Sequence, residues 1–155
     1  MNNFKVIIVE DVPLELKGTE GIIRNDIPEA EVIGTANNEA EYWRIIRDNQ
    51  PDLVLLDLGL GGSTTVGVEI CRHTKESYPA VKVLIFTGEI LNEKLWVDVL
   101  DAGADGIILK SGELLTRGDV RSVMEGKTMV FNEPILRRIV ERFKLSVNRE
   151  LTNQE

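Results

Sequence analysis

Reactive polar residues stand directly after short apolar runs at several points in this chain. The runs and the residues that follow them are Phe4–Val9 with Glu10 and Asp11, Leu53–Leu56 with Asp57, Val81–Phe86 with Thr87, and Gly106–Leu109 with Lys110. These runs show no alternation of apolar and polar residues, so they predict strands that are buried on both faces, as in parallel sheets. Because ligand sites in open α/β sheets lie at the carboxyl ends of the strands, we expect these side chains at one rim.

The chemistry of such a rim would combine a divalent cation with a phosphoryl group. Three carboxylates close together repel one another unless a cation lies among them, and Mg²⁺ prefers oxygen ligands. A bound cation would also lower the pKa values of the carboxylates and neutralise an incoming phosphoryl group. Asp57 could then act as a nucleophile and form an aspartyl phosphate. Lys110 would neutralise one phosphoryl oxygen, and the Thr87 hydroxyl would donate a hydrogen bond to another.

Each of these residues also has an ordinary structural interpretation. An Asp after a strand often caps a turn, and paired acids before a helix complement its dipole. A Thr at a strand end reflects β-propensity, and a Lys there is usually a solvated edge charge. The occurrence of all of them at the carboxyl ends of strands in one sheet favours the chemical interpretation.

The elements that must position these residues alternate between strands and helices. A further strand is expected at Glu31–Ala36, a fifth helix is expected to be capped by Ser111, and a sixth helix is expected at Pro134–Phe143, followed by a polar stretch. Alternating strands and helices with short connections predict a doubly wound parallel sheet with right-handed crossovers. Five such units favour a flavodoxin-like strand order of 2-1-3-4-5, with an extra C-terminal helix.

Composition limits the remaining functional classes. The chain has 155 residues, enough for one domain and a piece of another, and its net charge of −8 argues against general nucleic-acid binding. One cysteine, Cys71, and one histidine, His73, exclude an internal disulfide, a cysteine-based zinc site and a histidine-rich metal site. The N-terminal sequence is neither a signal peptide nor a membrane span, so we expect a cytoplasmic protein without membrane contact.

The ordered motifs closely resemble the receiver domain of two-component response regulators, which has a flavodoxin-like (CheY-like) fold. The resemblance is carried by Glu10-Asp11, by PDLVLLDLGLGG around Asp57, by VLIFTG with Thr87, and by AGADGIILKS with Lys110. It covers about residues 4–127.

The resemblance implies a role for each matching residue. Asp57 would be the phosphoacceptor of a sensor histidine kinase, Thr87 the switch hydroxyl and Lys110 the phosphoryl-binding lysine. Phosphorylation would lead to a surface change, with a homodimer as a plausible result. The expected Mg²⁺ ligands are the carboxylates of Glu10, Asp11 and Asp57 and the backbone carbonyl of Gly59.

The subtype resembles the LuxR/NarL group of transcriptional regulators, with two departures. The shared features are LLDL, GAxGxxLKS and GKTMVFNEP. Gly61 stands where the family usually has Pro, which we expect to loosen the loop after Asp57. Ile107 stands where an aromatic switch residue is common, which puts the usual coupling between that residue and Thr87 in question.

The C-terminal part predicts an incomplete output region. Residues 1–127 would form the receiver, and residues 128–155 would form a linker helix and the start of a missing helix-turn-helix domain. In the LuxR/NarL group that domain typically opens with LT-x-x-E, which the final LTNQE matches. We therefore expect DNA binding only through the missing domain.

Two other functions remain as alternatives. A phosphorylation-independent pseudo-receiver would use the same fold as an interaction module, but the intact set of acids, Thr87 and Lys110 counts against it. A metal-dependent phosphohydrolase of the haloacid-dehalogenase type would need a second Asp two residues after the nucleophile, where this chain has Gly59. The expected protein is thus a signalling phosphoacceptor that catalyses only its own phosphotransfer and dephosphorylation.

Overall fold

The structure of the protein is a computed structural model that describes residues 1–88, 92–110, 115–127, 130–131 and 133–153. Its strands are β1 Phe4–Val9, β2 Ala30–Ala36, β3 Leu53–Leu56, β4 Lys82–Thr87, β5 Gly106–Leu109 and β6 Val130–Phe131. Its helices are α1 Pro13–Asp26, α2 Glu39–Asp48, α3 Thr64–Ser77, α4 Glu93–Asp101, α5 Arg117–Met124 and α6 Glu133–Asn153, with a short 3₁₀ turn, η1, at Leu60–Gly62.

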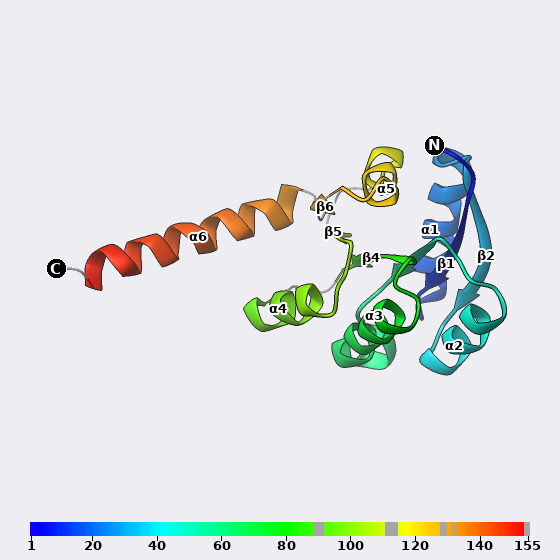
Figure 1. The fold of residues 1–155 in the computed structure, drawn as a ribbon, viewed down its shortest axis with the longest axis horizontal. Helices are drawn as coiled ribbons and strands as arrows, with labels where there is room; N and C mark the ends of the chain where they lie inside the picture. Colours follow the sequence, from blue (N-terminus) through cyan, green and yellow to red (C-terminus); the bar gives the residue numbers. More distant parts are fainter. Residues whose placement is uncertain (89–91, 111–114, 128–129, 132, 154–155) are drawn as a thin grey trace.

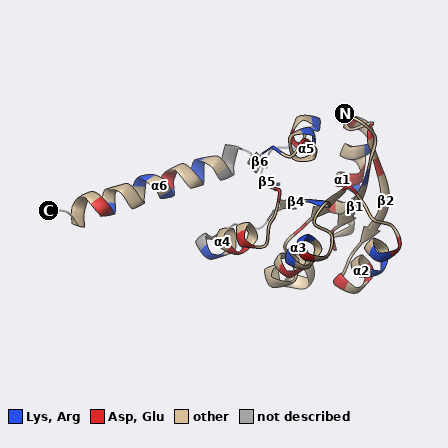
Figure 2. Cartoon of the chain, viewed as in Figure 1, with Lys and Arg blue, Asp and Glu red and all other residues tan. Residues whose placement is uncertain are grey.

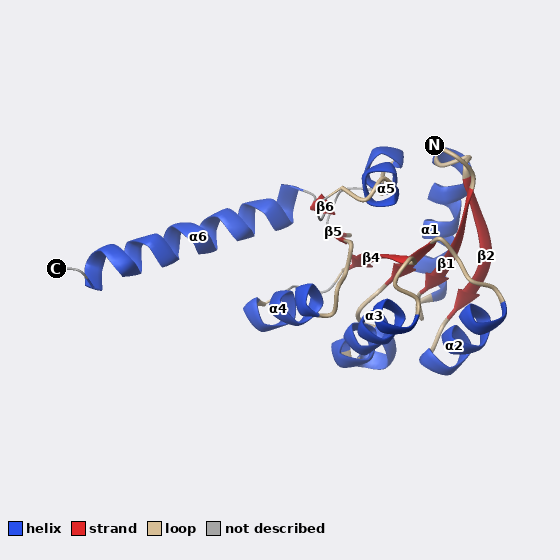
Figure 3. Ribbon diagram, in the orientation of Figure 1, coloured by secondary structure: helices blue, strands red, loops and turns tan. Residues whose placement is uncertain are grey.

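The strands form one parallel sheet with the order β2-β1-β3-β4-β5-β6 (Figures 1 and 3). The order predicted for the first five strands is therefore confirmed, including the edge position of β2. The sixth strand was not predicted. It pairs with β5 through two residues only, Val130 with Gly106 and Phe131 with Ile107, which is too short a run for a periodic pattern.

Helices cover both faces of the sheet, and this explains the unbroken apolar runs. Helices α1 and α5 pack on one face, and α2, α3 and α4 pack on the other (Figure 3). Adjacent residues of one strand enter different cores, as Leu55 and Leu56 of β3 do. All four residues of β3 are buried. Burial of one such side chain contributes about 1.5–3 kcal/mol, so β3 is held firmly at the centre of the sheet.

Side-chain caps mark the N-termini of α2, α4 and α5. The Asn38 side chain accepts a hydrogen bond from the Glu41 backbone N–H at 2.9 Å, as the sequence predicted for the start of α2. The expected cap at Ser111 lies outside the described residues. Helix α5 itself begins later, at Arg117, with Thr116 and Asp119 forming a reciprocal capping box.

Helix α6 is longer than the sequence predicted. It was expected to end at Phe143, but the structure continues it to Asn153. The extension Lys144–Asn153 contains no Gly or Pro, and Leu, Lys, Arg and Glu in it favour helix, which outweighs its polar character. Within the described part of the chain, no helix combines the length and apolar character that a membrane crossing requires.

Two helical glycines should respond in opposite ways to substitution by alanine. A Cβ atom at Gly67 would lie 2.7 Å from Leu58 Cα and 2.8 Å from the Leu58 carbonyl oxygen, so α3 needs glycine to approach the loop after Asp57. We expect Gly67→Ala to lower the free energy of unfolding by about 1–3 kcal/mol. Gly18→Ala, in open space on α1, should raise it by about 0.4–1 kcal/mol. Urea denaturation of both variants tests this pair, and equal effects would contradict the close approach.

Candidate functional site

Pairing among the central strands brings the polar residues to one rim of the sheet. Val9 of β1 lies opposite Leu56 of β3, so the residues that follow them, Glu10 and Asp57, emerge side by side. The backbone N–H of Asp57 donates to the carbonyl of Val9 at 3.0 Å, which extends the pairing beyond β3. At the next strands, the backbone N–H of Lys110 donates to the carbonyl of Thr87 at 2.8 Å.

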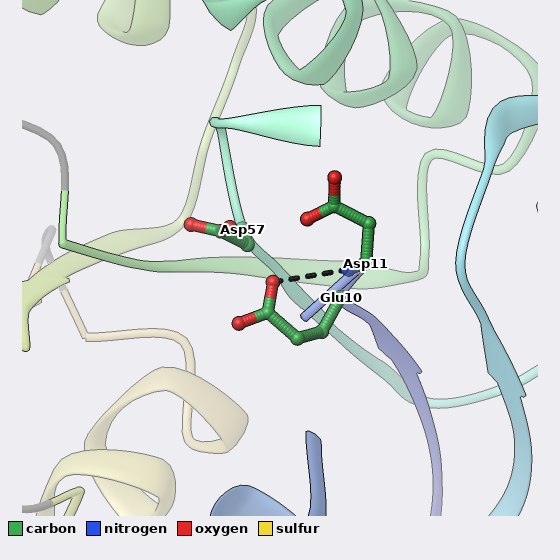
Figure 4. Close-up of side chains that lie close together, drawn as sticks. All are labelled: Glu10, Asp11 and Asp57. Atoms are coloured by element: carbon green, nitrogen blue, oxygen red, sulfur yellow. Dashed lines mark hydrogen bonds between the residues drawn. The ribbon is translucent and has the colours of Figure 1, made fainter. Parts of the chain in front are cut away.

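Three carboxyl groups form a compact cluster at this rim (Figure 4). One oxygen each from Glu10, Asp11 and Asp57 lies within 4.8 Å of the others. Glu10 is 2% exposed, Asp57 is 8% exposed and Asp11 is half-buried. Figure 4 shows the side chains of Glu10 and Asp11 rising from the end of β1 toward that of Asp57. The sequence-predicted acids are therefore brought together, mostly shielded from water.

Lys110 supplies the positive charge of the site. Its Nζ donates to Glu10 Oε1 at 2.7 Å, and it lies 3.6 Å from Glu15 Oε2. The ammonium is also 5.2 Å from the centre of the Phe86 ring. Sequence reasoning placed Lys110 at the rim but missed its pairing with Glu10. Since β3 and β4 separate the two strands, only the reach of a lysine side chain could have indicated this contact.

The electrostatics of the cluster favour a proton when no cation is bound. Burial is the main reason that the pKa of Glu10 rises to about 9, and the carboxyls of Glu15 and Asp57 add to the effect although Lys110 opposes it. Burial lowers the pKa of Lys110, but Glu10, Asp57 and Glu15 raise it more, so the net shift is upward. A cation that bound these carboxyl groups would displace the proton from Glu10. An anion could bind the charged ammonium of Lys110 in place of Glu10.

Gly61 connects the loop after β3 to the carboxyl cluster by a hydrogen bond. Its backbone N–H donates to Asp11 Oδ2 at 2.9 Å. Its φ of +60° and that of +77° at Gly62 belong to the left-handed region, which proline cannot enter. Glycine at this position provides a backbone donor to the Asp11 carboxylate that proline would lack, and the expected loosening of the loop stays a prediction.

Other predicted residues lie near the cluster but outside it. Thr87 ends β4 and is fully buried, so its hydroxyl is covered by protein. Gly59 is half-buried in the turn between Asp57 and η1, and its role as a carbonyl ligand stays a prediction. Ile107 is 2% exposed within β5 and packs into the sheet core. It therefore differs from the aromatic switch residue that is common at this position.

Comparison with known families identifies the domain. The family described as the response regulator receiver domain matches residues 6–116. The chain belongs to this family. Receiver domains are signalling modules rather than conventional enzymes, and the sequence resemblance is thereby confirmed together with the fold.

Individual relatives refine the subtype. The chain is 31% identical over 130 residues to the DNA-binding transcriptional activator DevR/DosR of Mycobacterium tuberculosis, which covers 83% of this chain and 58% of the relative. It is 32% identical over 128 residues to the oxygen regulatory protein NreC of Staphylococcus epidermidis, which covers 81% of this chain and 57% of the relative. The chain thus spans little more than half the length of these relatives, which are response regulators of the NarL/LuxR type.

Solved structures show the same fold. A LuxR-family two-component response regulator from Aurantimonas superposes with a TM-score of 0.79 at 27% identity, covering 91% of this chain and 98% of that one. The isolated receiver domain of RcsB from Salmonella enterica serovar Typhimurium, with the phosphomimetic BeF3−, gives a TM-score of 0.75 at 23% identity and covers 88% and 98% of the two chains. The second similarity concerns the fold alone.

The raised pKa of Glu10 predicts how the stability of the metal-free protein depends on pH, measured with a metal chelator in the buffer. Because the folded-state pKa of about 9 exceeds the usual 4.5, the stabilising contribution is complete below pH 4.5 and is lost as pH rises toward 9. Relative to Glu10→Gln, the free energy of unfolding of the wild type should fall across this window, by at most about 1.4 kcal/mol per pH unit. Chemical denaturation at a series of pH values measures this difference.

Glu29 provides a control of opposite sign. Its hydrogen bond from Arg117 lowers the pKa of Glu29 to about 2, so its contribution is present above pH 4.5 and is lost as pH falls toward 2. Glu29→Gln should therefore differ from wild type in its pH dependence only in the acid range. Parallel curves for wild type and Glu10→Gln between pH 4.5 and 9 would refute the electrostatic account of Glu10.

Proposed function

We propose that this protein is a phosphorylation-dependent switch that accepts a phosphoryl group on Asp57 from a sensor histidine kinase in the presence of Mg²⁺. The observation that carries the proposal is the convergence of three carboxyl groups within 4.8 Å at the end of β1 and β3, next to the Lys110 ammonium. Membership of the receiver family supports it as well. We also place the domain in the cytoplasm.

The donor set fits Mg²⁺. Hard divalent cations take carboxylate and carbonyl oxygens and keep several waters, and the carboxyls of Glu10, Asp11 and Asp57 offer such oxygens together with the Gly59 carbonyl. The ion would neutralise negative charge on the attacking carboxylate and the phosphoryl group. Gly61 would support this set by keeping the Asp11 carboxylate turned toward the loop.

Asp57 would act as the nucleophile. A carboxylate oxygen of Asp57 forms a bond to phosphorus while the phosphorus–nitrogen bond of the kinase phosphohistidine breaks, and the released imidazole takes its proton from solvent. Asp57 is only 8% exposed, which would limit the access of water to the aspartyl phosphate. Hydrolysis of the aspartyl phosphate would return Asp57 to the free carboxylate. The cycle would need no substrate besides the phosphorylated kinase and water.

Lys110 and Thr87 would respond to the negative charge of the phosphoryl group on Asp57. In the resting arrangement the Lys110 ammonium is bonded to Glu10, and the phosphoryl oxygens on Asp57 would compete for it. The Thr87 hydroxyl, now covered, would turn toward the same group. Because the phosphoryl group binds one arrangement of these residues more tightly, it would shift the population of conformers around α4, β5 and α5. Dimerisation on phosphorylation through that surface remains a plausible result.

The output would be transcription. We propose that residues 1–127 form the receiver and that residues 128–155 form a linker helix and the first residues of a DNA-binding domain. The support is the LTNQE sequence and the fact that the chain covers 58% of a relative named as a DNA-binding transcriptional activator. With a net charge of −8, and with DNA recognition assigned to the proposed output domain, these 155 residues alone would not bind DNA.

Intact mass spectrometry tests the proposed phosphoacceptor. Acetyl phosphate with Mg²⁺ should add one phosphoryl group to the wild type, and Asp57→Asn should abolish the addition because the nucleophilic oxygen is replaced. Asp52→Asn is the matched control, since Asp52 lies before the same strand and accepts a hydrogen bond from the Lys5 N–H at the opposite rim. A chelator should prevent the addition in every variant.

Two outcomes would overturn the proposal. An undiminished mass increase in Asp57→Asn would show that another residue accepts the group. No increase in the wild type, with the fold intact, would favour the phosphorylation-independent interaction module.

A further inference from the structure

A cavity of about 470 Å³ lies between α3 and α4. Its lining residues come from the first part of α3, up to Arg72, and from the start of α4, between Asn92 and Asp98. Neither the carboxyl cluster nor Lys110 contributes to its walls. Pockets for small molecules typically have volumes of about 300–1,000 Å³, so this cavity has the size of a ligand site that the proposed receiver function does not use.

Contacts at one end of the cavity hold the two helices together. The Arg72 guanidinium donates from Nη1 to Asp101 Oδ2 at 3.1 Å, and the Cys71 thiol donates to the Ala102 carbonyl at 3.8 Å. Asp101 is the last residue of α4. The C-terminal end of α4 is therefore joined to the middle of α3, while the cavity lies between the N-terminal parts of the two helices. These contacts belong to the fold itself, so the cavity is formed before any ligand binds.

Two apolar side chains line the cavity where it meets the core of the protein. Val68 of α3 is 5% exposed and belongs to the core cluster on this face of the sheet. Leu95 of α4 is half-buried and packs against the same cluster. An aliphatic group that contacted both side chains would remove further apolar surface from water, which favours binding. The cavity therefore offers one place for an apolar part of a ligand.

Charged side chains of both signs complete the lining. Each helix contributes one acid and one base, and these are Glu69 and Arg72 on α3 and Asp98 and Lys94 on α4. Figure 2 shows both signs of charge on these two helices. Arg72 donates to Glu69 at 3.4 Å and to Asp101, and its guanidinium has further N–H donors for a ligand. Among the described residues, none forms an ion pair with Lys94 or Asp98.

This combination of charges selects among ligands. A ligand with negative charge alone would be repelled by Glu69 and Asp98, and a ligand with positive charge alone would be repelled by Arg72 and Lys94. An uncharged apolar ligand would take water from the charged groups without replacing its hydrogen bonds, which is unfavourable. A small zwitterion instead offers a carboxylate to the bases and an ammonium group to the acids. The apolar part of the cavity then accommodates an aliphatic side chain.

We propose that the cavity between α3 and α4 binds a free amino acid with an aliphatic side chain. The side chain of the ligand lies against Val68 and Leu95. Its carboxylate is bound by Arg72 and Lys94, and its ammonium group is bound by Asp98. Because Lys94 is exposed to solvent, its charge is partly screened, and we expect a Kd in the millimolar range.

Titration with L-leucine, followed by nuclear magnetic resonance of the backbone amides, tests the proposal. The resonances of Val68 and Leu95 should shift with a saturable dependence on ligand concentration. Two analogues separate the contributions of the charged groups. Isocaproate is leucine without its ammonium group, and isoamylamine is leucine without its carboxylate. Each should bind about tenfold more weakly than L-leucine, because it leaves charged groups of the cavity without a partner.

Variants that remove one charge and keep the size of the side chain locate the site. Lys94→Gln and Asp98→Asn should each weaken the binding of L-leucine by about tenfold. The matched controls Lys17→Gln and Glu76→Gln change exposed residues outside the cavity and should bind as the wild type does. Asp57→Asn should also bind L-leucine normally, which separates this result from the phosphorylation proposal.

Three results would overturn the proposal. One is the absence of a saturable shift with L-leucine, L-isoleucine and L-valine. Another is binding of isocaproate or isoamylamine as tight as that of L-leucine. The third is undiminished binding of L-leucine by Lys94→Gln and Asp98→Asn, whose fold is checked by circular dichroism and thermal unfolding.

Discussion

Mutual repulsion among three clustered carboxyl groups, two of them buried and one half-buried, is the constraint on which this site depends. One oxygen each from Glu10, Asp11 and Asp57 lies within 4.8 Å of the others, and the pairing of β1 with β3 brings the backbones of Glu10 and Asp57 side by side. The apolar cores on both faces of the sheet offset the cost. Such a cluster does not stabilise the fold, because burial of like charges is unfavourable. The proposed binding of a divalent cation would make use of this concentration of carboxyl groups.

In the resting site, one internal cation, the Lys110 ammonium, offsets part of this repulsion. Lys110 reaches across β3 and β4 to Glu10, and burial leaves Glu10 inclined to retain a proton. The proposed function is an exchange of these internal partners for external ones, in which a divalent cation takes the carboxylates and a phosphoryl group on Asp57 takes Lys110. Gly61 contributes to the resting site, because its backbone N–H donates a hydrogen bond to Asp11 Oδ2.

The parts that could be predicted from sequence are those governed by strong local patterns. The runs at β1, β3 and β5 were predicted with their observed ends, so the residues after them were placed correctly. Contacts between distant segments could not be predicted. Tyr42 is fully buried, and its hydroxyl forms a 2.7 Å hydrogen bond with the Thr74 hydroxyl, a partner that no periodicity within α2 reveals. The two-residue β6 and the extension of α6 depend on tertiary pairing and on summed weak propensities, which short windows of sequence do not resolve.

Nuclear magnetic resonance of the Lys110 side-chain ammonium tests the central claim most directly. In the resting protein its nitrogen should show the hydrogen bond to Glu10, and Glu10→Gln should perturb it. Beryllofluoride with Mg²⁺, which mimics the phosphoryl group, should move the Lys110 resonance in the wild type and leave it unchanged in Asp57→Asn. If fluorine spectra show beryllofluoride bound to the wild type while the Lys110 resonance stays where it was, the exchange of partners at this site is contradicted.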